Sequence, residues 1–294
     1  MSLIQSTSND YKIIYKYLIE ITKQSKLKNG VMLVGPATSE EIFNTIDYNK
    51  MTVIFLCTEN MARRDFDKQR KYIHKSHIIL TGSPNQDVPQ NFNGKVFVIP
   101  AFFMWVDFTN NEIIHAIKGN VCYSLKEREG ICFIARDDVG KNRKRMLRYF
   151  RNNNTHIDCP SKIGNNCSSI ESRNMTKAQF LENYIFNLCP ENIYSEGYVT
   201  EKIFDSCVSG CIPVYFGGGI SHIEKIINME RVILTHGGFK THDYNDVLKK
   251  LNCLKNKENI EKFFYKPVFQ ENAYEEIKKL FNKIEEIKQH LCEL

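Results

Sequence analysis

The sequence predicts an α/β protein made of two doubly wound domains, each with a parallel sheet covered by helices on both faces. Short continuous apolar segments alternate with longer amphipathic segments through most of the chain, which is the pattern of buried parallel strands and their connecting helices. The alternation starts twice, with a break near Lys118–Arg128. The length of 294 residues accommodates two domains of ordinary size.

In the first alternation we expect four strands with flanking helices. Apolar runs bounded by turn residues predict strands at Val31–Val34, Val53–Cys57, Ile78–Leu80 and Val96–Ile99. Helical spacing of apolar residues predicts helices at Asp10–Lys26, Ser39–Ile46 and, more briefly, Asn111–Lys118. The stretch Gly119–Gly130 has the composition of a connection.

The second alternation predicts another sheet. Its expected strands are Ile131–Ala135, Ile185–Leu188, Ile212–Phe216 and Val232–Leu234. Its expected helices are Gly140–Asn152, Lys177–Tyr184, Val199–Ser209, Ile220–Asn228 and Tyr244–Leu251. A charged amphipathic helix is expected over Glu271–Glu293.

These elements predict a first domain over residues 1–120, a second over 121–270 and a C-terminal amphipathic helix over 271–294. Ligands of open parallel sheets bind beyond the carboxyl ends of the strands. With two such domains, the expected ligand site is a cleft that both of them face. Chemical motifs should therefore lie in loops that lead from a strand to a helix.

The composition indicates a globular protein with a substantial core, because 42% of the residues are hydrophobic and 25% are charged. No apolar run approaches the roughly 20 residues that a membrane span needs. The segment Met1–Asp10 is polar, without the apolar centre of a secretion signal, so we expect a cytoplasmic protein. The ten cysteines then read as reduced core thiols, and their spacing predicts no zinc site.

The net charge of +6 favours acidic partners. Its densest contribution is the run KNRKRMLRYFR at Lys141–Arg151. The run has the spacing of one helix, with its bases on the outer side, and lacks the interleaved glycines and aromatics of a nucleic-acid surface. We expect a solvated basic face, with one basic residue serving a ligand, and no nucleic-acid partner.

The stretch ENIYSEGYVTEKIFDSCVSGCIPVYFGG, from Glu191 to Gly218, combines a loop, a helix start and a buried strand. It places Glu201 and Lys202 at the first turn of a helix, after the carboxyl end of a strand. Free N–H groups there favour an anion. The lysine can add a point charge for a phosphate, and the glutamate can accept hydrogen bonds from sugar hydroxyls. The alternative is an ordinary capped helix start with a solvated lysine.

The longer run FNLCPENIYSEGYVTEKIFDSCVSGCIPVYFG resembles the donor-binding motif of the α1,3-fucosyltransferases, which transfer L-fucose from GDP-fucose. The positions that match in order and spacing are Phe186, Leu188, Glu191, Asn192, Tyr198, Thr200, Glu201, Lys202, Pro213 and Gly217. The resemblance implies an inverting glycosyltransferase of the GT-B type, with two facing Rossmann-like domains. It implies that the second domain binds GDP-fucose and the first binds a glycan acceptor, whose O3 is the expected position of attack.

The same resemblance implies the donor contacts. In the family, an arginine about ten residues after a strand similar to GICFIA binds the donor diphosphate, and this position corresponds to Arg143. Lys202 is the second cation at the diphosphate, and Glu201 accepts hydroxyl hydrogen bonds. Asn192 and Tyr198 match positions that contact the donor. The loop HIDCPSKIGNN resembles a family loop and supports this register.

The catalytic base is implied by VIFLCTEN in the first domain, which resembles the family's strand ending in a Glu-Asn pair. This element assigns Glu59 as general base for the acceptor hydroxyl. Glu191 is the other carboxylate of the motif. Its side chain could orient the loop, or it could contact fucose, and the sequence leaves the two roles open.

No cofactor is expected beyond the donor substrate, because Arg143 and Lys202 can stabilise the departing diphosphate as a metal does elsewhere. A divalent ion is expected at most to stimulate the reaction. Asp65 and Asp67 have D-x-D spacing within a polar helical stretch, which predicts surface charges. The adjacent Asp137 and Asp138 lack that spacing.

The chain departs from the family pattern at Pro190, at Arg136–Asp137 and at Gly217–Gly219. These differences leave the donor chemistry intact, while the acceptor and the oligomeric state stay undetermined. The alternatives are a transferase for another nucleotide sugar, a non-catalytic glycan-binding relative, and a nucleic-acid binder that uses Lys141–Arg151.

Overall fold

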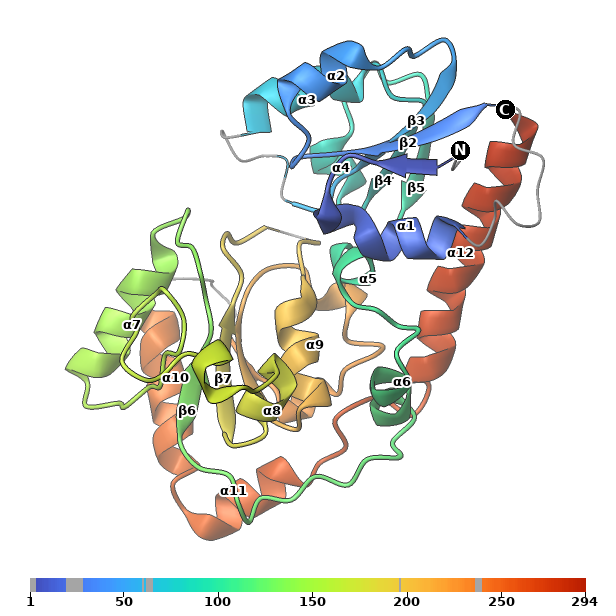
Figure 1. The fold of residues 1–294 in the computed structure, drawn as a ribbon. Coiled ribbons are helices and arrows are strands. Elements are labelled where there is room, and N and C mark those ends of the chain that lie inside the picture. The colour runs from blue at the N-terminus through green and yellow to red at the C-terminus, as the bar shows by residue number, and fades with distance from the viewer. Residues whose placement is uncertain (1–3, 20–28, 60, 62–65, 196, 236–239) are drawn as a thin grey trace. The chain divides into compact units, whose positions relative to one another are not determined.

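The computed structural model describes residues 4–19, 29–59, 61, 66–195, 197–235 and 240–294. The chain forms two compact units (Figure 1). Unit 1 comprises Met1–Asp107 and Glu275–Leu294, and unit 2 comprises Phe108–Tyr274. Each unit is built on a parallel sheet, so the expected α/β class with two parallel-sheet domains is confirmed.

The sheet of unit 1 has five strands in the order β1-β2-β3-β4-β5. These strands are β1 (Ile4–Ser6), β2 (Gly30–Val34), β3 (Met51–Leu56), β4 (Ile78–Thr81) and β5 (Lys95–Val98). Its helices are η1 (Asn9–Tyr11), α1 (Lys12–Ile19), α2 (Glu40–Thr45), α3 (Asp67–Ile73), α4 (Pro84–Asp87) and α5 (Ala101–Trp105), with most of α12 (Ala273–Glu293). The four predicted strands of this unit are confirmed, and β1 was not predicted.

Aromatic side chains hold the helices of unit 1 in place. Phe43 of α2 and Tyr72 of α3 stack with their ring centroids 4.1 Å apart, above buried residues of β2, β3 and β4. Phe281 of α12 lies edge-on to Tyr17 of α1 and Phe103 of α5, at 5.2 and 5.1 Å. Because of this packing, residues 275–294 are part of unit 1, whereas the sequence predicted a separate C-terminal element.

The boundary between the units lies at residues 107 and 108, earlier than the expected residue 120. The cause is helix α6 (Asn111–Ile117), which packs against α9 (Glu201–Val208) of unit 2. Phe108, just before α6, contacts Phe204 of α9 edge-on at 5.5 Å.

The sheet of unit 2 has four parallel strands in the order β6-β7-β8-β9. These strands are β6 (Ile131–Phe133), β7 (Phe186–Pro190), β8 (Ile212–Phe216) and β9 (Ile233–Leu234). The other helices of the unit are α7 (Asn142–Asn152), η3 (Glu171–Arg173), α8 (Lys177–Leu181), η4 (Ile220–His222), η5 (Met229–Arg231), α10 (Thr241–Cys253) and α11 (Lys257–Phe264).

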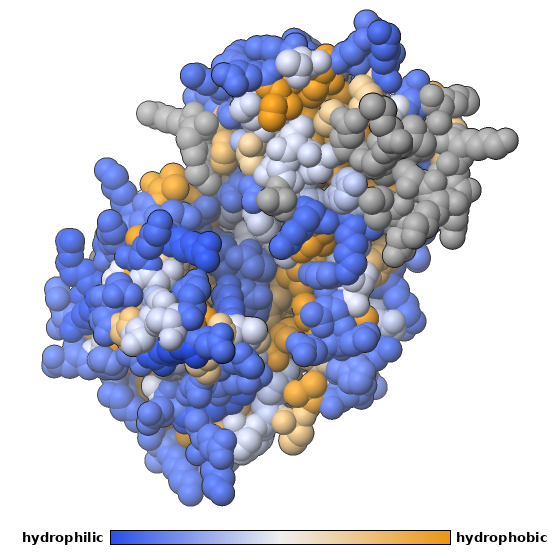
Figure 2. Space-filling view, in the orientation of Figure 1, coloured by the Kyte–Doolittle hydropathy of each residue, from blue (hydrophilic) through white to orange (hydrophobic). Residues whose placement is uncertain are grey.

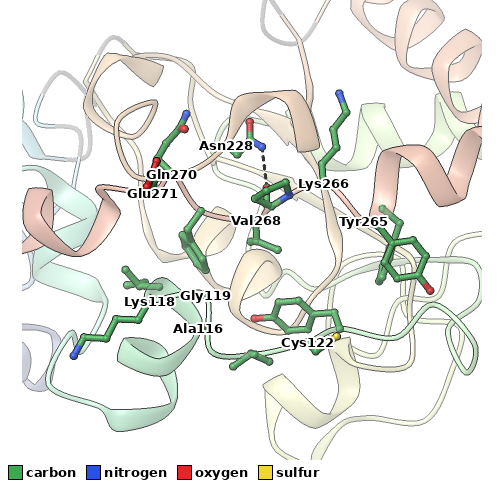
Figure 3. A pocket seen from close by; sticks show the side chains of 16 residues that line it. Ala116, Lys118, Gly119, Cys122, Asn228, Tyr265, Lys266, Val268, Gln270 and Glu271 are labelled. Atoms are coloured by element: carbon green, nitrogen blue, oxygen red, sulfur yellow. Dashed lines mark hydrogen bonds between the residues drawn. The ribbon is translucent and has the colours of Figure 1, made fainter.

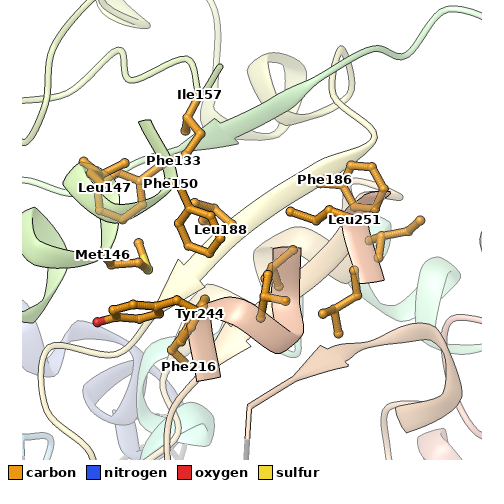
Figure 4. Close-up of a cluster of buried hydrophobic side chains, with 14 of the residues drawn as sticks. Phe133, Met146, Leu147, Phe150, Ile157, Phe186, Leu188, Phe216, Tyr244 and Leu251 are labelled. Carbon is orange, nitrogen blue, oxygen red and sulfur yellow. The ribbon is translucent and has the colours of Figure 1, made fainter. Parts of the chain in front are cut away.

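Helices cover both faces of this sheet. On one face, α7, α10 and α11 close a large apolar cluster over the strands (Figure 4). Its labelled members are Phe133, Met146, Leu147, Phe150, Ile157, Phe186, Leu188, Phe216, Tyr244 and Leu251. On the other face, α8 buries Phe180 and Leu181 against Cys132 and Cys211, and α9 packs on β7 and β8. The strands are therefore buried on both sides, as their continuous apolar sequences predicted.

The helix predicted over Ile220–Asn228 is wrong. The structure has one 3-10 turn, Ile220–His222, followed by turns. Ile227 instead forms an antiparallel bridge with Phe269, and the N–H of Asn228 donates to the carbonyl of Val268 at 3.0 Å. Pairing with a segment about forty residues further along the chain overrides the helix that the local spacing of apolar residues predicts.

Hydrophilic residues cover most of the face that Figure 2 shows, in keeping with a chain of which a quarter is charged. Over the described residues, every helix is too short or too polar to cross a bilayer.

Candidate active site

The motif that the sequence singled out lies at the carboxyl end of β7 in unit 2. β7 ends at Pro190, and α9 begins at Glu201 with Thr200 as its N-cap residue. Tyr198 and Thr200 are buried, while Asn192 is half-buried. The strand-to-helix loop predicted to carry the chemistry is therefore in the expected place.

Glu191 is the first residue of this loop, and none of its surface is exposed. Its carboxylate accepts the backbone N–H of Thr200 at 2.8 Å and the Thr200 hydroxyl at 2.8 and 3.0 Å. The hydroxyl of Tyr215, on β8, donates to it at 3.3 Å. A buried carboxylate needs such donors, and here they link the loop to the neighbouring strand.

Lys202 brings a positive charge to the same place. Its ammonium group lies 3.3 Å from a carboxylate oxygen of Glu191 and 3.3 Å from one of Glu201, and donates to the Thr200 hydroxyl at 2.7 Å. Burial alone would lower the pKa of Lys202, but the charges of Glu191 and Glu201 outweigh it and raise the pKa above its ordinary value. The lysine is therefore charged throughout the neutral range.

Glu201 has a second cation beside it, which the sequence analysis missed. Lys177 of α8 pairs with Asp205 of α9, one turn after Glu201. Burial would raise the pKa of Glu201, but the charges of Lys202 and Lys177 hold it at about 2. The spacing of Glu201 and Asp205 carried a signal, because like charges four apart on a helix need a cation between them. The identity of that cation had no local signal.

Arg143 enters from α7 and is almost fully buried, with 3% of its surface exposed. One guanidinium nitrogen, Nη1, donates to the carbonyl and the carboxylate of Asp137, and Nη2 donates to the carbonyl of Pro190 at 3.1 Å. Its Nε is buried and has no hydrogen-bond partner among the described residues. The side chain thus ends at the carboxyl end of β7, where the motif begins.

The loop before α7 also reaches the motif. The carboxylate of Asp138 caps α7 by accepting the N–H groups of Arg143 at 2.8 Å and Lys144 at 3.2 Å. A Cβ at Gly140 would lie 2.4 Å from the carbonyl oxygen of Asn192. The glycine therefore permits the loop before α7, which carries Arg143, to contact the loop before α9, which carries Lys202.

Arg143 and Lys202 are close enough to act on each other electrostatically. After burial, the charge of Arg143 is the other influence that lowers the pKa of Lys202. Two like charges near each other attract an anion with several oxygens, and a guanidinium and an ammonium together suit a diphosphate. The structure thus brings together Arg143, Asn192, Tyr198, Glu201 and Lys202 in unit 2. Their roles toward a donor stay predictions.

Glu59, the predicted base, belongs to unit 1 and follows β3. It is half-buried, and Asn60 beside it lies outside the described residues. The indole N–H of Trp105 donates to the carbonyl of Thr58 at 2.9 Å, which fixes the backbone just before Glu59. The position at the carboxyl end of a strand is as expected, and the role stays a prediction.

The carboxylates considered for a metal have other partners where they are described. Asp137 and Asp138 are bound to the start of α7. Asp67 is exposed and pairs with Arg70 on the same helix, and Asp65 lies outside the described residues. Over the described part of the chain, no group of three or more His, Cys, Asp or Glu side chains could hold a metal ion.

Unit 2 also has cavities away from these residues. One of about 580 Å³ lies between the segments 116–123 and 264–271 (Figure 3). Two of its polar groups have partners, since the Asn228 amide donates to the carbonyl of Pro267 at 2.9 Å and Lys266 pairs with Glu230 at 3.0 Å. A second, of about 910 Å³, includes Tyr123 and Glu182. None of the candidate donor residues lines either cavity.

Comparisons with known proteins agree with the motif. The model of glycosyltransferase family 10 (fucosyltransferase), C-terminal part, matches residues 123–294, more than half of the chain. The matched range includes every candidate donor residue and does not include Glu59.

The alpha-(1,3)-fucosyltransferase FucT of Helicobacter pylori is 42% identical over 81 residues, which are 27% of this chain and 16% of that protein. A crystal structure of an alpha1,3-fucosyltransferase has a TM-score of 0.60 at 17% identity, covering 96% of this chain and 89% of that one. A structure of alpha1,3-fucosyltransferase with GDP gives 0.59 at 18% identity, with the same coverage. These structural matches establish the likeness of fold.

Proposed function

The chain belongs to glycosyltransferase family 10, the fucosyltransferases, and from this premise we propose that it transfers L-fucose from GDP-fucose to a hydroxyl of a glycan acceptor. The expected acceptor position is O3. The β-linked fucose of the donor becomes an α-fucoside, so the anomeric centre is inverted in a single displacement.

The observation that carries this proposal is the pair of cations at the carboxyl end of β7, buried Arg143 and half-buried Lys202. Arg143 has 3% of its surface exposed and a buried Nε without a hydrogen-bond partner among the described residues. Lys202 is held at the start of α9 by Thr200 and Glu201. A nucleoside diphosphate offers the oxygens that both groups need. A sugar bound there would find the carboxylate of Glu201 as a hydroxyl acceptor.

The reaction assigns one task to each group. The acceptor oxygen attacks C1 of fucose while the bond from C1 to the diphosphate oxygen breaks. GDP leaves with the electron pair, and Arg143 and Lys202 stabilise its growing negative charge. Glu59 takes the proton of the attacking hydroxyl. Neither cation needs a metal to perform its part, so the proposal includes no metal, and an added divalent ion at most stimulates.

Thermal-shift measurements with GDP, UDP, CMP and GDP-fucose test the donor, and an acceptor array with GDP-fucose then tests transfer. The expected result is stabilisation by GDP and GDP-fucose, with release of GDP in the presence of an acceptor glycan. Stabilisation by UDP or CMP instead would favour another nucleotide sugar. Steeply salt-dependent nucleic-acid binding without any response to GDP would favour the Lys141–Arg151 surface and contradict the proposal.

A further inference from the structure

We infer that Glu191 positions Lys202, both through the hydroxyl of Thr200 and through its own contact with the ammonium group at 3.3 Å, and does not itself contact the donor. The inference deepens the proposed function, on which its consequence for GDP binding rests. It assigns Glu191, whose role the sequence left open between loop orientation and fucose binding, to the first of these.

The hydrogen bonds form a directed chain. A threonine hydroxyl has one proton to donate and two lone pairs to accept with. The Thr200 hydroxyl gives its proton to the carboxylate of Glu191 and accepts a proton from the Lys202 ammonium at 2.7 Å. The carboxylate thereby fixes the orientation of the hydroxyl, and the hydroxyl fixes the direction of the ammonium group.

The Thr200 side chain takes part in these hydrogen bonds instead of capping α9, which is the usual role of an N-cap residue. A threonine at an N-cap normally accepts an N–H of the first helical turn with its side chain, which stabilises the helix. Among the described residues, the Thr200 side chain makes no such bond. Its backbone N–H is instead bound by Glu191 at 2.8 Å. The motif therefore uses a preferred capping residue to hold a lysine.

The two charged partners of Thr200 differ in their exposure to solvent. Glu191 has no exposed surface, whereas 20% of the Lys202 side chain is exposed. A donor molecule can thus reach the lysine without reaching the glutamate. The same burial leaves Glu191 without access to an acceptor hydroxyl, so it is unsuited to be the general base.

The neighbouring strand supports Glu191 from the other side. Tyr215 of β8 donates its hydroxyl to the carboxylate at 3.3 Å. A Cβ at Gly217 would lie 2.3 Å from that hydroxyl, so the glycine leaves the space that the tyrosine occupies. Gly217, one of the matched motif positions, thus supports the same hydrogen bonds indirectly, because it leaves room for Tyr215.

The test compares GDP affinity, measured by calorimetry, in Thr200→Val and Thr200→Ser. Valine has the shape of threonine without the hydroxyl, and we expect about a 3- to 10-fold weaker Kd, the effect of one net hydrogen bond. Serine keeps the hydroxyl and should restore the wild-type Kd. Glu191→Gln should weaken binding as valine does. Glu182→Gln, an exposed residue of the same unit, is the matched control and should leave the Kd unchanged.

A double-mutant cycle with Lys202→Met separates positioning from general structural damage. In the Lys202→Met background, Thr200→Val should no longer change the Kd for GDP. An equal loss in both backgrounds would overturn the inference. If the wild-type protein binds no GDP, the proposed donor is wrong, and the same cycle is then measured in urea unfolding. Coupling between positions 200 and 202 in the unfolding midpoints would support the positioning role, and strictly additive midpoints would overturn it.

Discussion

The loops after β3 in unit 1 and after β7 in unit 2 occupy equivalent places, each following a buried strand that has parallel neighbours on both sides. They differ in how charge is arranged. The β7 loop joins Glu191 and Lys202 through Thr200 and through a direct contact at 3.3 Å. In the described part of the β3 loop, the N–H of Cys57 donates to the carbonyl of Leu80 at 2.9 Å, and the indole N–H of Trp105 donates to the carbonyl of Thr58 at 2.9 Å.

This difference separates binding from chemistry. A cluster of charges that is held in place by its own hydrogen bonds is suited to hold an anion in one orientation, because fixed groups need little reorganisation. A carboxylate that follows the end of a strand is suited to accept one proton, which is the role proposed for Glu59. Substitutions in unit 2 should therefore change donor affinity, and substitutions at Glu59 should change turnover.

The largest expected effect is on turnover in Glu59→Gln. Glutamine keeps the shape of the side chain but cannot accept a proton at neutral pH, so kcat should fall by about 10²–10⁴-fold, the usual contribution of a positioned base. The Kd for GDP should stay at its wild-type value. Steady-state assays with a saturating acceptor and calorimetry with GDP measure the two quantities.

Glu41→Gln is the matched control, since Glu41 is an exposed carboxylate of the same unit; it should change neither quantity. Near-normal turnover in Glu59→Gln would place the base elsewhere. A parallel loss of GDP affinity would remove the separation between the two loops.

The second effect concerns the cations of unit 2. Arg143→Ala and Lys202→Ala should each weaken GDP binding by about 1.5–3 kcal/mol, the range for a charge-assisted hydrogen bond. Arg143→Lys should recover part of the loss, because a lysine supplies charge without the two-pronged geometry. Calorimetric titration with GDP measures all three variants.

Arg148→Ala tests whether net charge alone explains such losses, because Arg148 is exposed on the same helix as Arg143. It should bind GDP as the wild type does. Unchanged affinity in both Arg143→Ala and Lys202→Ala would contradict the donor-site assignment.

A third effect uses a buried carboxyl group of unit 1. Burial raises the pKa of Asp87 to about 6, while hydrogen bonds from the Thr81 hydroxyl and the Met61 backbone act in the opposite direction. The folded state therefore binds this proton more tightly than the unfolded state does. The contribution of Asp87 to stability should be fully present below about pH 4 and should be lost as the pH rises through about 6, by about 2–3 kcal/mol at 1.36 kcal/mol per unit.

Urea unfolding between pH 4 and 7 measures this dependence, and Asp87→Asn should flatten it. Asp67→Asn, at an exposed position of the same unit, should leave the slope as it is. A wild-type protein that gains stability over this interval would show that other groups dominate. The contrast with Glu191, which has Lys202 beside it, is that Asp87 is held by neutral donors.

The sequence predicted those parts of the structure whose signals are local. Continuous apolar runs located the strands, the motif after β7 located Glu201 and Lys202, and the run GICFIA located Arg143 on the following helix of the same unit. Partners distant in sequence had no such signal. Lys177 reaches Asp205 from another helix, and Tyr215 reaches Glu191 from another strand.

The same limit explains the wrong helix over Ile220–Asn228, where pairing with Phe269 replaces helical hydrogen bonds. It also explains the C-terminal helix, whose amphipathic spacing predicted a helix but could not indicate that Phe281 packs on unit 1. Local pattern indicates the kind of element, but long-range pairing can override it, and long-range packing decides which unit the element joins.

The smallest expected effect is that of metal removal. If Arg143 and Lys202 together stabilise the leaving diphosphate, excess chelator should leave kcat unchanged in the wild type. Arg143→Ala has one of those charges removed, so added Mg²⁺ should raise its residual rate more than it raises the wild-type rate, because a cation at the diphosphate then replaces the lost charge. Fucosyl transfer with and without chelator, and over a range of Mg²⁺ concentrations, measures both.

A complete loss of wild-type activity that added metal reverses would mean that side-chain cations are insufficient. Asp65, Asp67, Asp137 and Asp138 would then be the positions to substitute first, and the two cations after β7 would no longer account for departure of the diphosphate.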